Sequence, residues 1–336
     1  MRKIKGQNMK GWYAAGGLLL LLAIFFSLML GSRDVTSGRL FAALINGPGA
    51  PDQTARIILM NVRLPRTLGA VLCGMGLACA GLLLQSALNN VLAAPGIIGI
   101  NAGAGLAVLA ASIAFPGFVF ARSAAAFAGS LLAAGLVCLI ANKAGISKTS
   151  LILAGVAVSS LMNGFINGII TWRPELVSDK TAFSLGGLSL VSLSALKFSI
   201  PFFAGGILIA LIISGGIDLF ALGDEAAAGI GLNVMACRNL AVFAATILAG
   251  AAVSLCGLLS FVGLIIPNLI RLLPAEHFRS RLVLCMLYGS SFLVFCDIIA
   301  RTLFYPYELP AGLLLSVLGS PFFIWILIRR RRRLSV

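Results

Sequence analysis

The chain has 336 residues, of which 60% are hydrophobic and 10% are charged, and its mean hydropathy is +1.06. Soluble domains carry roughly 25% charged residues, so this composition excludes a soluble globular protein and requires lipid around most of the surface. The net charge of +15 does not indicate nucleic-acid binding, because the basic residues are scattered between hydrophobic runs. Their one dense group, Arg329 to Arg333, follows a hydrophobic run, as is typical of the cytoplasmic flank of a spanning helix.

Charge-free hydrophobic runs follow one another along the whole chain, and a spanning helix needs ~20 apolar residues. The two longest runs must therefore contain breaks, which we expect at Asn89, Asn90, Pro95 and Gly96 in the first and near Gly257 and Gly263 in the second. The sequence predicts an all-α polytopic membrane protein with about ten transmembrane helices, in a single domain over residues 1–336. The charge-free runs are 11–32, 67–121, 123–142, 149–172, 198–217, 239–270, 282–296 and 309–328.

The flanking charges predict the topology. Basic residues precede the first run, as they follow the last, so both termini are expected on the cytoplasmic side. The run 11–32 is longer than the ~7–15 residue core of a signal peptide and is interpreted as the first spanning helix. The segments 33–62 and 173–197 are the longest expected on the outer side, with the composition of loops and short surface helices.

A polar segment, 218–238, separates two of the charge-free runs, and it holds three of the ten acidic residues. It contains the pattern EAA-xxx-G. A short helix held at the membrane surface by two spanning helices is what a subunit needs to receive force from another subunit, so we interpret the segment as a coupling element. Its candidate residues are Gly223, Asp224, Glu225, Ala226, Ala227 and Gly231.

Two groups of charged residues lie at expected helix ends. Asp297 and Arg301 are four residues apart on one helix and form either a helix-end ion pair, or a carboxylate that restrains Arg301 at the outer face, or, least favoured, part of a proton relay. Arg63 and Arg66 flank Pro65. They act either as anchors at the lipid headgroups or as an outward basic patch that accepts acidic groups of a partner.

Uncharged polar residues inside the apolar runs form either interhelical hydrogen bonds or the lining of an aqueous path. The polar path candidates are Gln85, Asn163 and Asn167. Pro267 is a further path candidate, because it interrupts a helix and indicates either a kink or a short helix beside a gate. Glycines at helical spacing, such as Gly164 and Gly168, are expected to pack helices closely.

The sequence offers no catalytic or metal-binding set. The one histidine, His277, is interpreted as a solvated loop residue, and no Ser-His-Asp arrangement is credible. The seven cysteines mostly lie in apolar runs without CxxC spacing, as packing residues. The chain has no GxxxxGK[ST] loop, so it should not hydrolyse ATP by that means. A secondary transporter remains an alternative, but Asp297 is the one mid-membrane charge available to it.

Four ordered motifs resemble the permease subunits of the ABC importers for iron-siderophores and vitamin B12. The resemblance covers roughly residues 15–330. Two departures occur, Val91 where proline is usual and Asn268 where histidine is usual. The motifs are RLPRTLGAVLCGMGLACAGLLLQSALNNVLAAPGIIGINAGA, LGDEAAAGIGLNV, FVGLIIPNLIRLL and DIIARTLFYPYELPAGLLLSVLGSPFFIWIL.

The resemblance implies a permease for a ferric siderophore or other iron chelate, or alternatively for vitamin B12 or haem. It implies a second permease, either a copy of this chain or a related one, two cytosolic ATPases that carry ATP and Mg, and an extracytoplasmic binding protein in a bacterial cell. No cofactor is implied on this chain. Arg63, Arg66 and Arg301 resemble the arginines that meet acidic residues of the binding protein, and residues 222–234 resemble the coupling helices.

Overall fold

The computed structural model describes residues 2–31, 38, 52–143, 148–189, 191–304 and 307–334, and these residues form helices and connecting turns without a β-strand. The main helices are α1 (Arg2–Met29), α4 (Leu64–Ala87), α5 (Ile100–Ala114), α6 (Val119–Lys143), α7 (Lys148–Trp172), α9 (Leu193–Ile212), α12 (Val234–Cys256), α13 (Val262–Ile270), α14 (Phe278–Thr302) and α15 (Ala311–Leu334). Short elements complete the fold: α3 (Gln53–Ile58), η2 (Leu59–Arg63), η3 (Pro95–Ile98), η4 (Pro174–Leu176), α8 (Val177–Leu185), α10 (Ser214–Leu219), η5 (Phe220–Leu222) and α11 (Asp224–Gly229).

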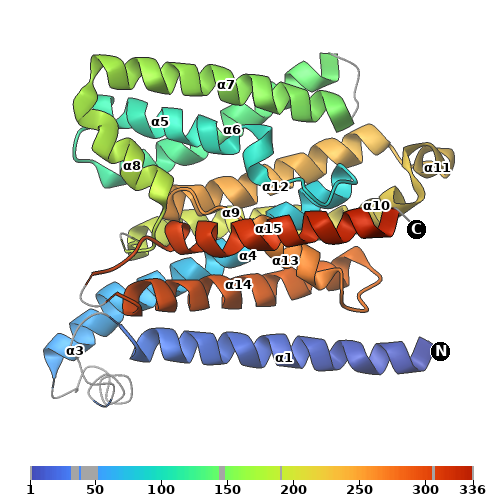
Figure 1. Cartoon of the computed structure of the whole chain (residues 1–336), viewed down its shortest axis with the longest axis horizontal. Helices are drawn as coiled ribbons and strands as arrows, with labels where there is room; N and C mark the ends of the chain where they lie inside the picture. The colour runs from blue at the N-terminus through green and yellow to red at the C-terminus, as the bar shows by residue number, and fades with distance from the viewer. Residues whose placement is uncertain are drawn as a thin grey trace.

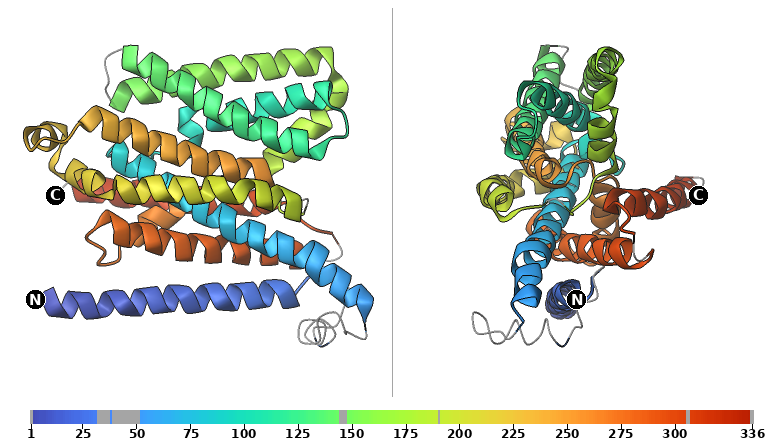
Figure 2. Two further views of the ribbon diagram at one scale, coloured as in Figure 1. Left: turned by 180° about the vertical axis from the view of Figure 1, so that it is seen from behind. Right: turned by 90° about the vertical axis from the view of Figure 1, so that its left-hand side faces the viewer.

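The long helices lie side by side in one bundle (Figures 1 and 2). In the described part of the chain, seven helices are long and apolar enough to cross a membrane, and α5 and α15 provide shorter apolar helices. This confirms the predicted all-α polytopic fold. The marked N-terminus and C-terminus lie at the same end of the bundle, which we call the terminal end (Figure 1).

Residues 52–62 belong to the segment 33–62, in which the sequence predicts loops and short surface helices, and from Gln53 onward they are helical and continuous with α4. α3, η2 and α4 form one continuous helical stretch, Gln53–Ala87, of 35 residues. At 1.5 Å per residue it spans ~52 Å, more than the ~30 Å hydrocarbon core, so α3 extends beyond the membrane. The remainder of that segment, 33–51, lies outside the described residues apart from Gly38. The segment 173–197 does contain the expected short helix, α8.

The predicted breaks occur where the chain needs unusual backbone angles. After α4, Asn89 has φ 47° and Gly99 has φ 78°, and after α12, Gly257 has φ 68°. Asparagine and glycine adopt this left-handed region more readily than other residues. The second break lies where it was expected, between Gly257 and Gly263, because α12 ends at Cys256 and α13 begins at Val262; Gly263 itself is the second residue of α13. There it faces Gly81, so its role is packing.

The core is built around α4, which is mostly buried along its length. A Cβ atom on Gly81 would overlap the carbonyl group of Gly263 in α13, and one on Gly74 would overlap the carbonyl group of Gly289 in α14. The glycines therefore allow backbone contact between these helices. Gly164 and Gly168 of α7 have nothing within 4 Å of such a Cβ, so the expectation that they pack helices within this chain is wrong.

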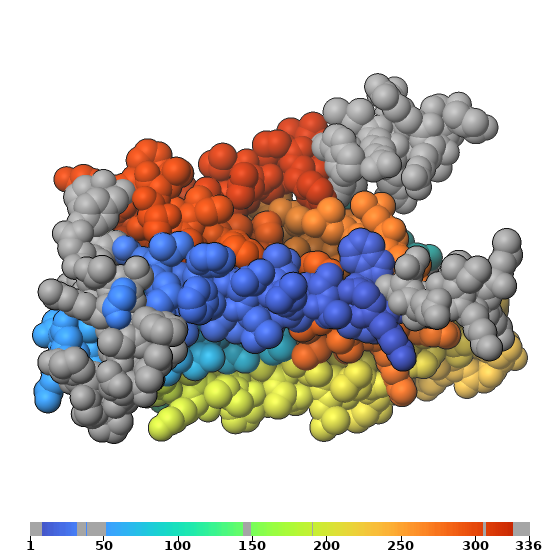
Figure 3. Space-filling model, turned by 90° about the horizontal axis from the view of Figure 1, so that it is seen from below, coloured from blue at the N-terminus to red at the C-terminus, as the bar shows by residue number. Residues whose placement is uncertain are grey.

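α1 lies along one side of the bundle (Figure 3) and exposes Leu18, Leu21 and Phe25 as a lipid-facing surface. Polar contacts hold this peripheral helix: the Tyr288 hydroxyl donates to the Trp12 carbonyl oxygen at 3.2 Å, and the Ser27 hydroxyl lies 2.7 Å from that of Thr67.

Candidate functional site

The predicted coupling element forms a separate short helix, α11, that projects at the terminal end (Figure 1). Gly223 (φ 95°) and Gly231 (φ 90°) lie just before and after it, and both adopt angles that favour glycine. Ala227 is fully buried, whereas Glu225 and Ala226 are exposed. The element therefore presents one small, partly apolar face and anchors itself by the other.

Arg238, in the first turns of α12, holds α11 in place. Its Nη2 atom lies 2.8 Å from Oδ2 of Asp224, and its Nε donates to the carbonyl oxygen of Ala87, the last residue of α4, at 3.1 Å. The guanidinium also lies 5.6 Å from the centre of the Phe220 ring. A buried cation requires such partners, and Arg238 is 3% exposed. The sequence analysis did not identify Arg238 as a functional residue. Its position directly before the charge-free run 239–270 could have indicated such a role.

Asp218 connects the same segment to α14. Its Oδ1 accepts a hydrogen bond from the backbone N–H of Phe278 at 2.7 Å and lies 3.5 Å from Nη2 of Arg281. A carboxylate at a helix N-terminus satisfies a free donor and suits the helix dipole. His277 is solvated as predicted, with its side chain 79% exposed, and its Nδ1 lies 3.6 Å from Asp218. The coupling element is thus bonded to α4, α12 and α14.

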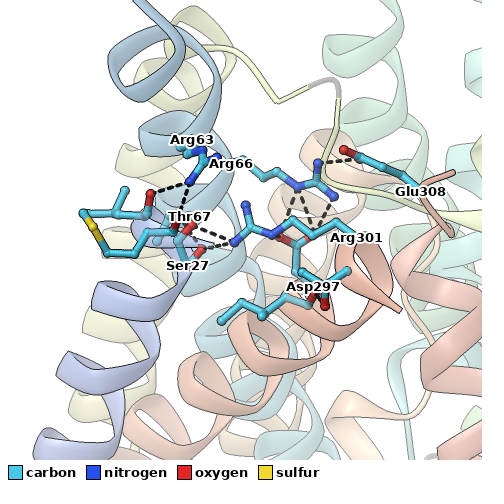
Figure 4. Close-up of polar contacts among 11 residues, drawn as sticks. Ser27, Arg63, Arg66, Thr67, Asp297, Arg301 and Glu308 are labelled. Carbon is cyan, nitrogen blue, oxygen red and sulfur yellow. Dashed lines mark hydrogen bonds and ion pairs between the residues drawn. The ribbon is translucent and has the colours of Figure 1, made fainter. Parts of the chain in front are cut away.

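At the opposite end of the bundle, the three predicted docking arginines come together (Figure 4). We call Arg63, Arg66, Asp297, Arg301 and Glu308 the charged cluster. Arg63 donates to the carbonyl oxygens of the last turn of α1, and both distances are 2.8 Å. Arg301 donates to the carbonyl oxygen and hydroxyl of Ser27 at 2.7 and 2.8 Å.

Arg66 has two carboxylate partners. Its Nε donates to both oxygens of Asp297 at 3.0 Å, and its Nη1 lies 2.7 Å from Oε2 of Glu308. Asp297 also lies 3.6 Å from Nε of Arg301, which is the ion pair expected from their spacing. A π-helical turn, η2, ends at Arg63, two residues before Pro65, which lacks an N–H donor. Arg63 contacts α1, and Arg66 contacts α14.

The burial of the cluster corrects one expectation. Arg63, Arg66 and Arg301 are 4%, 7% and 2% exposed, so they do not form an exposed outward patch in this conformation. Charged side chains taken out of water need close partners. Carboxylates supply them to Arg66 and Arg301, and carbonyl oxygens of α1 supply them to Arg63. The grouping of the three arginines at one end agrees with the sequence prediction, and their docking role remains a prediction.

An open cavity of about 530 Å³ lies beside the cluster. Its wall includes Arg66, Glu308 and the partly exposed ion pair of Arg122 and Asp179, which are 3.3 Å apart. A second cavity, of about 260 Å³, is lined by residues of α5, α7 and α8, among them Asn163.

The four path candidates separate into two kinds. Gln85 is fully buried in this conformation, where its Nε2 donates to the carbonyl oxygen of Gly263 at 3.2 Å and joins α4 to α13. Pro267 is also buried, inside α13, and does not line a path within this chain. Asn163 and Asn167 are exposed, and Oδ1 of Asn167 accepts a hydrogen bond from Lys180 at 3.4 Å. Of the four, Asn163 and Asn167 are the exposed ones in this conformation.

The two departures from the usual motifs contact each other. Nδ2 of Asn268 donates to the carbonyl oxygen of Val91 at 3.1 Å and to that of Leu264 at 2.7 Å. Asn268 thereby joins α13 to the turn between α4 and η3. Residues 91 and 268 are thus in direct contact, which the sequence alone could not show.

A bundle of apolar spans with a short exposed helix at one end and a buried charged cluster at the other is the architecture of a multi-pass membrane protein. A profile of the FecCD transport family matches residues 19–329, and the chain belongs to this family. It is thus a multi-pass protein of the bacterial plasma membrane.

Two curated relatives and one solved structure illustrate the similarity. The chain is 34% identical to the Fe(3+)-citrate import system permease protein YfmD of Bacillus subtilis (strain 168), over 95% of this chain and 94% of the relative. It is 33% identical to the ferric enterobactin transport system permease protein FepD of Escherichia coli (strain K12), over 94% of each. A metal-chelate type ABC transporter in an inward-facing conformation matches with a TM-score of 0.83 and 27% identity, over 94% of this chain and 98% of that chain.

Proposed function

We propose that this chain is the permease subunit of an ATP-driven importer for a ferric siderophore or a similar iron chelate. The observation that carries the proposal is the match over nearly the whole length to permeases named for ferric citrate and ferric enterobactin transport. The buried charged side chains of the described residues add support, because they lie at the two ends where partners would bind. Substrate choice would belong largely to the binding protein.

The proposed assembly contains this chain paired with a second copy or a related permease, two cytosolic ATPases and an extracytoplasmic binding protein. The ATPases carry ATP and Mg and contact α11, so the terminal end is cytoplasmic. The exposed side chains of Leu222 (63%) and Ile230 (62%) flank α11 and favour a protein contact there. The binding protein docks at the opposite end, on the surface above the charged cluster.

The transport step is alternating access of the two permeases around a central path. When ATP closes the ATPases, a force on α11 passes through Asp224 to Arg238 and from Arg238 to the carbonyl oxygen of Ala87 at the end of α4. Packed helices move as rigid bodies, so a push at one end displaces the whole of α4. Asn163 and Asn167, exposed on α7, are proposed to face the path.

Reconstitution tests the function. The chain is assembled in proteoliposomes with its cognate ATPase and binding protein, and uptake of ferric citrate, ferric enterobactin, haem and vitamin B12 is measured. We expect ATP-dependent uptake of a ferric chelate that stops when the ATPase is replaced by a hydrolysis-deficient variant. Uptake driven by a proton or sodium gradient without ATP would instead identify a secondary transporter, and preference for haem or vitamin B12 would change the substrate class.

The coupling role is tested at an exposed position of α11. Ala226→Trp adds bulk to the face that would enter the ATPase, whereas Ala226→Ser keeps the side chain small. We expect the tryptophan variant to insert normally but to lose uptake and substrate-stimulated ATP hydrolysis, and the serine variant to keep both. Equal activity of the two variants would show that this face does not contact the ATPase.

The docking role is tested by charge reversal. Arg63→Glu plus Arg301→Glu should weaken association with the binding protein most at low salt, because charges are screened over ~10 Å at 0.1 M. Both residues hold α1, so the unfolding midpoint is measured first, and the exposed Arg173→Glu serves as the matched charge control. Unchanged affinity and salt dependence in a folded double variant would leave these arginines with a structural role alone.

A further inference from the structure

Arg66 shares its guanidinium between a fixed carboxylate and an accessible one. Asp297 lies inside the bundle with its side chain 1% exposed, and it contacts Arg66 at 2.9 to 3.0 Å. Glu308 contacts the same guanidinium at 2.7 Å, but its side chain is 32% exposed. Figure 4 shows Glu308 approaching Arg66 from the side opposite to α1. The two contacts therefore differ in how easily another group could replace them.

The cluster also carries an excess of positive charge. Three arginines face two carboxylates, and within the described part of the chain the hydrogen bonds of Arg63 go to main-chain carbonyl oxygens of α1. Buried cations are stabilised by each additional carboxylate that approaches them. The charged cluster is thus suited to receive a carboxylate from outside. Arg66 is the arginine of the cluster that already pairs with an exposed carboxylate, that of Glu308.

Glu308 belongs to the segment that leads into α15. The backbone N–H of Leu309 donates to the carbonyl oxygen of Ala300 at 3.0 Å, and that of Gly312 donates to the carbonyl oxygen of Gly186 at 3.4 Å. Residues 308–311 form part of the wall of the 530 Å³ cavity. A change in the partner of Glu308 would therefore alter the rim of this cavity and the beginning of a spanning helix.

We propose that Glu308 occupies, within this chain, the position that an acidic side chain of the binding protein takes on docking. On docking, the partner carboxylate replaces Glu308 on Arg66, while Asp297 stays in place and keeps the guanidinium oriented. Loss of the contact between Glu308 and Arg66 releases the segment 307–310, so docking changes the chain at the start of α15. This inference rests on the proposed docking function and adds the residue that competes with the partner.

The association of the assembled transporter with its separately purified binding protein tests the exchange. Glu308→Gln removes the competing charge and keeps the shape of the side chain. We expect its affinity for the binding protein to rise about three- to tenfold, within the range of partly exposed to well-formed charge pairs. Glu175→Gln is the matched control, since Glu175 is another acidic residue in an exposed ion pair and its removal changes the net charge equally.

Arg66→Gln separates this inference from the docking function itself. If Arg66→Gln does not weaken association, the docking function at this residue is wrong. If Arg66→Gln weakens association but Glu308→Gln behaves like Glu175→Gln, docking stands and the exchange is wrong. A weaker association in Glu308→Gln would also overturn the exchange, because Glu308 would then be a support for Arg66. In the Arg66→Gln background, we expect Glu308→Gln to have no further effect.

A spin label at position 307 provides a second measurement. Tyr307 is 78% exposed, so Tyr307→Cys in a chain without its native cysteines can carry the label without disturbing the core. We expect the label to become more mobile when the binding protein docks, and to be mobile without it in the Glu308→Gln variant. A label that keeps the same mobility in all three states would contradict the exchange.

Discussion

The strongest single test of the charged cluster is the removal of its buried carboxylate. Asp297 is fully buried and lies 2.9 Å from Nη2 of Arg66 and 3.6 Å from Nε of Arg301. Asp297→Ala leaves two guanidinium groups near each other without the carboxylate between them. We expect the variant to insert into the membrane and to be much less stable than the wild type.

The expected loss follows from the partners that remain. Breaking a buried ion pair by removal of one member costs ~3–5 kcal/mol. Arg66 keeps Glu308 and Arg301 keeps Ser27, so the lower end, ~3 kcal/mol or about 100-fold in the unfolding equilibrium, is the appropriate estimate. Asp297→Ala combined with Arg301→Met should recover part of this loss, because it removes one of the unpaired charges.

The measurement is reversible unfolding in mixed micelles, with Asp179→Ala as the control. Asp179 lies at the same end of the bundle and pairs with Arg122 at 3.3 Å, but both side chains are about a third exposed. Removing an exposed pair costs ~1 kcal/mol or less. Equal losses in Asp297→Ala and Asp179→Ala would refute the reasoning that burial gives the cluster its strength.

Three further predictions concern packing, coupling and the path. Gly81→Ala should destabilise the chain by ~1–3 kcal/mol in the same unfolding assay, because the added Cβ would overlap Gly263. Gly164→Ala, whose added Cβ meets open space, should be neutral or slightly stabilising. The reverse order would contradict the assigned helix contact. Gly231→Ala should cost ~1–2 kcal/mol through its φ of 90° yet keep uptake, whereas Gly231→Trp should lose uptake; loss of uptake in both would show that conformation, not bulk, matters. Cysteines at Asn163 and Asn167 should react with a water-soluble thiol reagent in the assembled transporter, with a reactivity that changes on addition of ATP; positions unreactive in every state would exclude the path.

The backbone preferences and polarity of short segments made the helix breaks and the short helix α11 predictable from the sequence. The break after α4 depends on Asn89 and Pro95, whose backbone preferences act within a few residues. The exposed short helix at α11 was likewise visible as a polar segment between apolar runs. These features require no knowledge of which helices are neighbours, and the structure agrees with them.

The direction of each polar side chain could not be predicted, because it depends on helix neighbours distant in sequence. Gln85 and Asn163 are both amides in apolar helices, yet Gln85 is buried against Gly263 and Asn163 is exposed. Arg301 was expected to present its charge outward, but its hydrogen bonds go to Ser27 of α1, 274 residues away. The sequence identified the three arginines and Asp297 but missed Arg238 and Glu308, and it left open whether each polar side chain binds a helix of the same chain.

The contacts at the two ends of the bundle involve the same two helices. α4 carries Arg66 near its first turn and the Ala87 carbonyl oxygen, bonded to Arg238, at its last residue. α14 carries Asp297 near its end and the N–H of Phe278, bonded to Asp218, at its start. These two helices touch through glycine backbones, so they cannot slide apart without losing close packing. If the binding protein docks at one end and the ATPases at the other, as proposed, α4 and α14 provide a direct mechanical connection between them.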